Sequence, residues 1–289
     1  MAKNTKKIEL IAGYWTLAGD CYAMGPSEVS PIPLRERVEA ASWAGYIGMG
    51  LVHQDLLANA KAMGYPAMKR MLGDNGIRHV DIEFLGDWFK TGKAKKASDK
   101  VRMELLEAAS ELGAKTVKVA GEMWAEDCDI AKMGHALASV CEDAREIGLE
   151  VALEILPMSN VRKIGTALGI LAEAGQPNAG LCVDIWHFVR GGIDFAKIAA
   201  LPAQYLKIVE LNDAAAKMKG TMWDDTLFRR LYPGEGSFDC PGFIAAVDAT
   251  GWKSPYSVEI INETYRKLPL REQAKRSFDG TMAQFAGRT

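Results

Sequence analysis

The sequence has little of several features that mark particular protein classes. It has no large excess of either charge, because 35 Lys and Arg residues oppose 37 Asp and Glu residues, for a formal net charge of −2 over 289 residues. Nucleic acid would need a local basic patch, so we predict no nucleic-acid partner. The five cysteines form no CxxC pair, which indicates neither a disulfide framework nor a thiolate zinc site.

Targeting signals and long apolar runs are also missing. The chain starts with several basic residues, but no apolar run of useful length follows them, as it would in a signal peptide. No stretch approaches the roughly 20 apolar residues of a membrane span. We therefore expect a cytoplasmic protein without a membrane partner.

Short apolar segments alternate with amphipathic segments along the chain. Eight apolar segments are rich in Val, Ile, Leu or aromatic residues, which is typical of strands. They cover residues 7–15, 46–53, 77–85, 115–121, 149–156, 178–185, 204–213 and 255–262. Because they are apolar almost throughout, we expect strands that are buried on both faces, as in a parallel sheet.

The segments between these strands have helical periodicity. The clearest helices are predicted over residues 34–45, 99–112, 129–147, 160–174 and 268–286, with Asp99 as the cap of the second. No GxGxxG motif follows the first strand, and no linker interrupts the alternation, which argues against a doubly wound sheet and a second domain. Eight units of about 36 residues predict an α/β protein, a single (β/α)8 TIM barrel over residues 1–289.

Two predicted loops are longer than usual. They cover about residues 16–32, after the first strand, and about residues 212–239, after the seventh. Both leave the C-terminal ends of strands, where barrels place their active sites. We expect lids or subunit contacts there, with tolerated insertions as the alternative.

Four carboxylates interrupt the last four apolar segments, at or near the end of each predicted strand: Glu154, Asp184, Glu210 and Glu259. A carboxylate buried alone costs several kcal/mol. Four at one barrel mouth require a compensating cation, and oxygen ligands suit Mn²⁺ or Mg²⁺. The alternative is that one or two of them form structural ion pairs with Lys118, Lys207 or Arg190.

Side chains near these carboxylates are candidates for catalysis and substrate binding. Asp184 and His187 form a DxxH motif, and Arg190 follows it, so His187 is predicted to contact substrate or transfer a proton. Lys118 would either stabilise an enolate oxygen or pair with Glu154. Trp186 stands where a sugar ring could stack.

The second half of the chain resembles the xylose isomerase-like TIM barrels. The matching motifs are LEILP (153–157), DIWH (184–187), ELND (210–213), PGEGSFD (233–239) and SVEI (257–260). That group includes sugar and ketose 3-epimerases, inosose and dehydroshikimate dehydratases, and endonuclease IV. The resemblance implies one divalent metal ion held by Glu154, Asp184, the strand-seven residue and Glu259. It also implies acid–base catalysis, often by the two glutamates.

The strand-seven residue departs from the family pattern. Most epimerase-like members carry His in an HxxD motif where this chain has Glu210. A carboxylate ligand there favours a hard ion, Mn²⁺ first and Mg²⁺ or Co²⁺ after it, over Zn²⁺. Alternatively, Glu210 lies outside the ligand shell and water completes the coordination. Endonuclease IV is a remote candidate, because it needs a His-rich trinuclear zinc cluster and this chain has four His.

The first two predicted strands are similar to the large subunit of bacterial C-glycoside deglycosidases. GYWTLAGD (13–20) and GYIGMGLVHQDL (45–56) place Trp15 and His53 near the mouth. Trp15 could stack on a sugar, and His53 is either a catalytic residue or a helix-entry residue. The resemblance implies metal-assisted β-elimination of a 3-keto-C-glycoside, and a small second subunit; otherwise we expect a homo-oligomer.

The chemistry common to these candidates is removal of the proton next to a carbonyl, with an enolate as the product. Expulsion of a β-substituent from the enolate would make the protein a lyase on a sugar or keto-glycoside. Reprotonation would instead make it a ketose or aldose isomerase or a 3-epimerase. The sequence favours the lyase and keeps the other two as alternatives.

Overall fold

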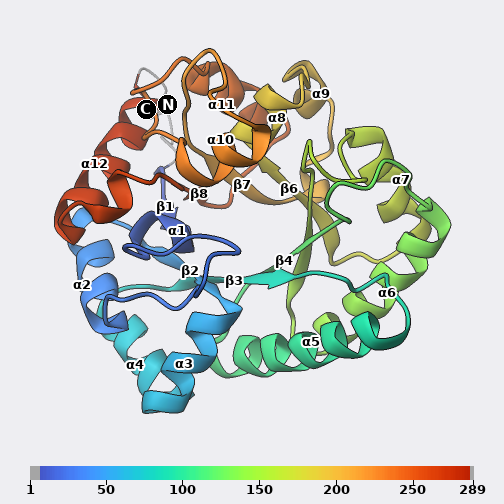
Figure 1. Ribbon diagram of the computed structural model, residues 1–289, viewed down its shortest axis with the longest axis horizontal. Helices are drawn as coiled ribbons and strands as arrows, with labels where there is room; N and C mark the ends of the chain where they lie inside the picture. Colours follow the sequence, from blue (N-terminus) through green and yellow to red (C-terminus); the bar gives the residue numbers. More distant parts are fainter. Residues whose placement is uncertain (1–6, 287–289) are drawn as a thin grey trace, which may run out of the picture.

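The computed structural model describes residues 7–286, in which helices surround a closed barrel of parallel strands (Figure 1). The strands pair in chain order, and β8 pairs with β1 to close the ring. The predicted (β/α)8 TIM barrel is therefore confirmed. The eight strands are β1 (Leu10–Ala12), β2 (Gly48–Val52), β3 (His79–Leu85), β4 (Thr116–Ala120), β5 (Glu150–Glu154), β6 (Ala179–Asp184), β7 (Leu206–Leu211) and β8 (Tyr256–Val258).

Helices occupy the connections between these strands (Figure 1). In chain order they are α1 (Tyr14–Leu17), α2 (Leu34–Ala44), α3 (His53–Met63), α4 (Tyr65–Asp74), α5 (Gly92–Leu112), α6 (Ile130–Glu146), α7 (Ile164–Ala174), α8 (Ile185–Arg190), α9 (Ala196–Ala199), α10 (Met222–Phe228), α11 (Cys240–Ala249) and α12 (Leu270–Ala283), with 3₁₀ turns η1 (Ala203–Tyr205) and η2 (Tyr265–Lys267). Within residues 7–286, no helix has the length and apolar character needed to cross a membrane.

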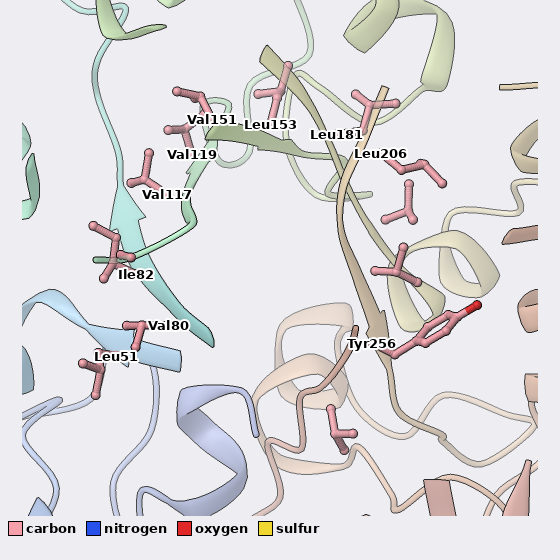
Figure 2. Packing of buried hydrophobic residues seen from close by; sticks show 14 of the residues in the cluster. Leu51, Val80, Ile82, Val117, Val119, Val151, Leu153, Leu181, Leu206 and Tyr256 are labelled. Atoms are coloured by element: carbon pink, nitrogen blue, oxygen red, sulfur yellow. The ribbon is translucent and has the colours of Figure 1, made fainter. Parts of the chain in front are cut away.

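Side chains on each strand alternate between the helix layer and the barrel interior. On β4, Val117 and Val119 belong to the large core beneath the helices, and Figure 2 shows such side chains around the ring of strands. Lys118, between them, has its ion-pair partners inside the barrel. The same alternation places the polar residues of the later strands on the interior side, toward the C-terminal mouth.

The first strand is shorter than the predicted 7–15, because the chain turns at Gly13. The Gly13 amide donates to the Val258 carbonyl oxygen at 2.9 Å, and the Thr16 hydroxyl donates to the same oxygen at 2.6 Å. Gly50 leaves room for this turn, since a Cβ there would lie 2.7 Å from the Tyr14 backbone nitrogen. The turn becomes α1, which carries Trp15.

Helix α5 begins at Gly92, seven residues before the predicted start at 99. The prediction of Asp99 as a cap is wrong, because Asp99 lies inside the helix. Its carboxylate pairs with Lys95 on one side and, at 3.3 Å, with Arg102 on the other. The Ser98 hydroxyl also donates to the Gly86 carbonyl at 2.6 Å, which fixes the first turns to the end of β3. These contacts extend the helix through a segment with few apolar residues.

The long segment after β7 is folded against the barrel. It contains α10, and Asp213 forms an antiparallel bridge with Leu231. The Asp213 carboxylate accepts hydrogen bonds from the backbone amides of Gly234, Gly236 and Phe238, at 2.9 to 3.0 Å. One side chain therefore fixes both ends of the segment, and the residues between them are held over the mouth.

Candidate active site

A cavity of about 420 Å³ opens at the C-terminal ends of the strands. Its base is a group of buried charged and polar side chains, which we call the charged floor. The charged floor consists of Glu83, Lys118, Glu154, Asp184, His187, Glu210, Arg230 and Glu259, and none of these residues is more than 6% exposed. Six of them line the cavity, and Asp184 and Glu210 lie behind the lining, where they pair with Arg230 and Lys118. They come from β3 to β7, from the start of α8, and from the segments that follow α10 and β8.

Lys118 lies at the centre of three carboxylates. Its ammonium nitrogen is 2.7 Å from Glu210 Oε1, 3.0 Å from Glu259 Oε1 and 3.0 Å from Glu83 Oε2. An ammonium group has three N–H donors, so these contacts use all of them. Burial lowers the pKa of Lys118, but the three carboxylates outweigh it and raise that pKa well above its usual value. Lys118 is therefore a fixed internal cation. It pairs with Glu210 and Glu259, as the ion-pair alternative for the strand carboxylates predicted, and not with Glu154, the partner predicted for Lys118 itself.

Arg230 is a second internal cation. Its Nη1 atom lies 2.6 Å from Asp184 Oδ2 and 2.8 Å from Glu259 Oε2. Its Nη2 donates to the Thr226 hydroxyl at 3.0 Å, and its guanidinium lies 5.4 Å from the ring centre of Trp186. Arg230 thus links the strand carboxylates to α10.

His187 contacts the carboxylates of β5 and β6. Its Nε2 lies 3.1 Å from Glu154 Oε1 and 3.7 Å from Asp184 Oδ2, while its buried Nδ1 has no hydrogen-bond partner among the described residues. Asp184 accepts further hydrogen bonds from the Trp186 amide at 2.7 Å and from Asn212 Nδ2 at 2.9 Å. Both carboxylates therefore have fixed orientations.

Glu83, Glu154, Asp184 and Glu210 have shifted pKa values, in two opposite directions. Burial and the charge of Glu259 raise the pKa of Glu210 well above its usual value. Burial raises the pKa of Glu83 to about 7, although Lys118 opposes the shift. Burial also acts to raise the pKa of Glu154 and Asp184, but nearby cations, Lys118 for Glu154 and Arg230 for Asp184, lower both below their usual values.

These shifts show that negative charge exceeds positive charge in the floor. Five carboxylates face two obligate cations, which leaves three negative charges when all the acids are ionised and His187 is neutral. This excess of negative charge is relieved when a carboxylate takes up a proton or when another cation binds. The prediction that the four strand carboxylates need a cation is thus partly met from within the chain, and an excess remains.

Three sets of side chains could contribute to holding a metal ion. They are Glu154, Cys182 and Glu210; Glu154, Asp184 and His187; and Asp184, Glu210 and Glu259. Within each set, one ligand atom per residue lies within 4.8 Å of the others. The sets share members, so all four predicted carboxylates belong to one continuous region.

Two predicted residues from the first half of the chain line the same cavity. Trp15 does so from α1, and His53 from the first position of α3. His53 Nε2 also lies 2.8 Å from Glu104 Oε2 on α5. His53 therefore begins a helix, as one alternative predicted, and it also faces the cavity, while a catalytic role for it stays a prediction.

Trp186 and Arg190 are not among the described residues that line the cavity, although we predicted that they bind substrate. Both donate to the carboxylate of Asp225 in α10, Trp186 from Nε1 at 3.1 Å and Arg190 from Nε at 2.8 Å. Their hydrogen bonds to Asp225 therefore hold α10 in place without lining the cavity. Lys207, another predicted ion-pair partner, pairs with Glu150 at 2.6 Å, away from the floor.

Sequence reasoning missed Glu83 and did not assign Arg230 to the floor. Glu83 has a signal, because Val80 and Ile82 belong to the outer core and the position that follows Ile82 in the strand faces inward. Arg230 has only a weak signal, since it follows β7 by almost twenty residues and reaches the floor because Asp213 and α10 fold the segment back.

The chain is similar to several known proteins in sequence and in fold. A protein-family model described as xylose isomerase-like TIM barrel matches residues 38–282. The 3-dehydroshikimate dehydratase of Pseudomonas aeruginosa is 29% identical over 247 residues, which cover 83% of this chain and 38% of that protein. An inosose isomerase of Halalkalibacterium halodurans is 26% identical over 150 residues, which cover 51% of this chain and 52% of that protein.

The structural comparison extends over nearly the whole chain. The crystal structure of the IolI protein with a bound zinc atom superimposes with a TM-score of 0.80 at 18% identity, covering 98% of this chain and 99% of that chain. At this identity the likeness shows the shared fold. The chain spans 38% to 52% of the length of the two curated relatives described above.

Proposed function

This chain belongs to the xylose isomerase-like TIM-barrel family, and from that premise we propose that it is a divalent-metal-dependent enzyme that removes the proton next to the carbonyl of a keto-sugar. The observation that carries the proposal is the charged floor, in which five buried carboxylates exceed two buried cations. Buried charge of this kind is costly unless it is compensated. Perturbed carboxyl pKa values in a cleft are also typical of catalytic sites.

The floor suits a divalent ion by charge and by chemistry. Two further positive charges would reduce the excess from three negative charges to one, and the oxygen donors suit Mn²⁺, Mg²⁺ or Co²⁺. We assign Glu154, Asp184, Glu210 and Glu259 as the residues that would hold it. Bound there, the ion would supply Lewis-acid polarisation of the substrate's carbonyl oxygen.

Glu154 is the proposed base. Its lowered pKa keeps it ionised, it lines the cavity, and the hydrogen bond to His187 orients it. It removes the proton from the carbon next to the carbonyl, and the electron pair of that C–H bond passes into the enolate. Glu259 faces the same cavity, and Lys118 and Arg230 hold its two oxygens. It is the second of the two glutamates proposed for acid–base catalysis.

The fate of the enolate decides the reaction class. In the favoured reaction, β-elimination of a 3-keto-glycoside such as a 3-keto-C-glycoside, the enolate electrons re-form the carbonyl and a new C=C bond. The bond to the β-substituent breaks, and the leaving group departs with that electron pair and takes up a proton. His53, more exposed than the floor residues, is the proposed donor of that proton.

Isomerisation or 3-epimerisation is the second candidate. The likeness to an inosose isomerase supports it, since the two reactions share the enolate. Here Glu259 would return a proton to the neighbouring carbon or to the opposite face. Likeness to the dehydratase, which by its name removes water, supports the elimination.

Incubation in D₂O separates these reactions. We would supply a 3-keto-C-glycoside and a panel of ketoses and follow both deuterium uptake and aglycone release. Aglycone release favours the lyase, and deuterium uptake with the substituent retained favours the isomerase or epimerase. If neither occurs with any substrate, the proposed chemistry is wrong. Co-purification of a small second subunit would also favour the deglycosidase-like lyase.

A further inference from the structure

The cavity changes character between its base and its mouth. Above the charged floor, its sides carry large apolar side chains from the segments after β1, β4, β5 and β7 and from β3 itself. We call this group the apolar wall, and it consists of Met24, Phe84, Met123, Leu156, Trp223 and Leu227. A hydroxylated sugar that stacks on a single ring would leave most of this wall uncovered.

Part of the apolar wall is open to solvent. Met24 is 72% exposed and Phe84 is 38% exposed. Trp124, which is 62% exposed, extends the wall outward because its ring makes an edge contact with Trp223 at 5.8 Å between ring centres. Grouped apolar side chains on a surface mark binding sites more often than isolated ones do.

Backbone geometry independently marks the same place. Among residues 7–286, three non-glycine residues have positive φ: Met24 at 58°, Asp87 at 56° and Trp124 at 63°. Met24 and Asp87 line the cavity, and Trp124 contacts Trp223, which lines it. Such a backbone costs on the order of 1–3 kcal/mol per residue, and it concentrates at ligand-binding positions. Folding therefore holds exposed apolar side chains at the mouth in an unfavourable conformation.

We propose that the apolar wall binds the uncharged, aromatic aglycone of a glycoside whose sugar ring lies on the charged floor. The assignment rests on the proposed function for the position of the sugar. A cavity of about 420 Å³ falls in the range of about 300–1,000 Å³ that encloses drug-sized ligands, so it has room for both parts. Aromatic rings pack well against Trp, Phe and the flexible thioether of Met.

Charge at the mouth selects against an anionic aglycone. Glu28 and Asp87 line the cavity beside the apolar wall, and both are acidic. The lining cations, Lys118 and Arg230, lie in the floor and are already paired with carboxylates. A phosphate or carboxylate on the aglycone would meet these acids without a free cation.

The test compares two glycosides that lack a ketone, so that binding is measured without turnover. Phenyl β-D-glucopyranoside and methyl β-D-glucopyranoside are titrated into the full-length protein by calorimetry. We expect the phenyl glycoside to bind at least tenfold more tightly. Phe84→Ala and Trp223→Ala should each remove most of this preference and leave the affinity for the methyl glycoside unchanged.

Trp43→Ala is the matched control, because Trp43 is 51% exposed on α2 and is not a cavity residue. It should keep the full preference. Equal affinity for the two glycosides, no binding of either, or a preference that survives both wall variants overturns the assignment. So does a dimer that Phe84→Ala dissociates, since a second copy would then cover the wall.

The experiment also separates this assignment from the proposed function. Neither glycoside can form an enolate, so the phenyl preference does not depend on catalysis. A clear preference together with no deuterium uptake by any keto-sugar would keep the aglycone site and reject the enolisation chemistry.

Discussion

The charged floor and the apolar wall belong to one cavity, but they differ in what folding requires of them. Floor residues are at most 6% exposed, and each carboxylate or cation in the floor has a partner. Wall residues such as Met24 and Phe84 remain open to solvent and contribute little to the core. The floor residues therefore affect both stability and chemistry, whereas the exposed wall residues can bind a ligand.

The largest expected effect is on catalysis, at the base. Glu154→Gln should lower turnover of a keto-sugar substrate by about 10³-fold, because general base catalysis is worth roughly 10²–10⁴-fold. The amide keeps the size of the side chain but cannot take the proton. Initial rates measure the effect. Glu122→Gln, a 40% exposed side chain after β4, is the control and should stay near wild type. Wild-type turnover in Glu154→Gln would remove Glu154 from the mechanism.

Lys118→Met should lower the free energy of unfolding by about 3–5 kcal/mol, because it leaves buried carboxylates without their cation. Urea unfolding of chelator-treated protein at neutral pH measures this. The control is Lys207→Met, whose partner Glu150 is 46% exposed, and it should cost less than about 1 kcal/mol. Equal losses in the two variants would show that the floor does not depend on its internal cation.

The pH dependence of stability should also report on the floor. Burial raises the pKa of Glu83 from 4.5 to about 7, so the folded protein holds more protons than the unfolded chain between these values. The contribution of Glu83 to the free energy of unfolding is fully present below pH 4.5 and is lost as pH rises through 7. Glu210, whose pKa is also raised, acts in the same direction. In chelator, the free energy of unfolding should fall by on the order of 2–3 kcal/mol from pH 5 to 8.

The matching variant for this measurement is Glu83→Gln, which cannot titrate and should flatten the slope. Glu154 and Asp184 have lowered pKa values, so their contribution is present above the usual carboxyl range and is lost only below it. They leave the window from pH 5 to 8 unaffected. A wild-type slope in Glu83→Gln would assign the protons to other groups.

The smallest effect is expected at the mouth. Trp124→Ala should change the free energy of unfolding by no more than about 0.5 kcal/mol, as exposed substitutions usually do. Trp88→Ala, at a side chain only 2% exposed, should cost about 3–5 kcal/mol. Urea titrations of the two variants give the comparison. A large loss in Trp124→Ala would mean that the mouth is part of the core after all.

The sequence predicts the fold and much of the floor, because both follow from local patterns. Apolar runs give the strands, and alternation along a strand places Glu154, Asp184 and Glu210 on the inner face. The same alternation also places Glu83 of β3 on the inner face. These predictions need only the period of a strand and the rule that C-terminal ends share one mouth.

Other residues depend on how segments pack, and local patterns do not specify this. Arg230 reaches the floor because Asp213 holds the segment after β7 in a folded path. Trp186 and Arg190 face Asp225 because of the way in which α8 and α10 dock. Asp99 has the appearance of a helix cap, yet ion pairs with its helical neighbours carry α5 past it.

The central claim is that one divalent ion offsets most of the carboxylate excess of the floor. Calorimetric titration of chelator-treated protein with Mn²⁺ tests it most directly, with elemental analysis of protein purified without chelator beside it. We predict one ion per chain, proton release on binding, and at least a tenfold weaker affinity in Asp184→Asn. Metal-free protein that processes a keto-sugar at the full rate and binds no Mn²⁺ would contradict the claim.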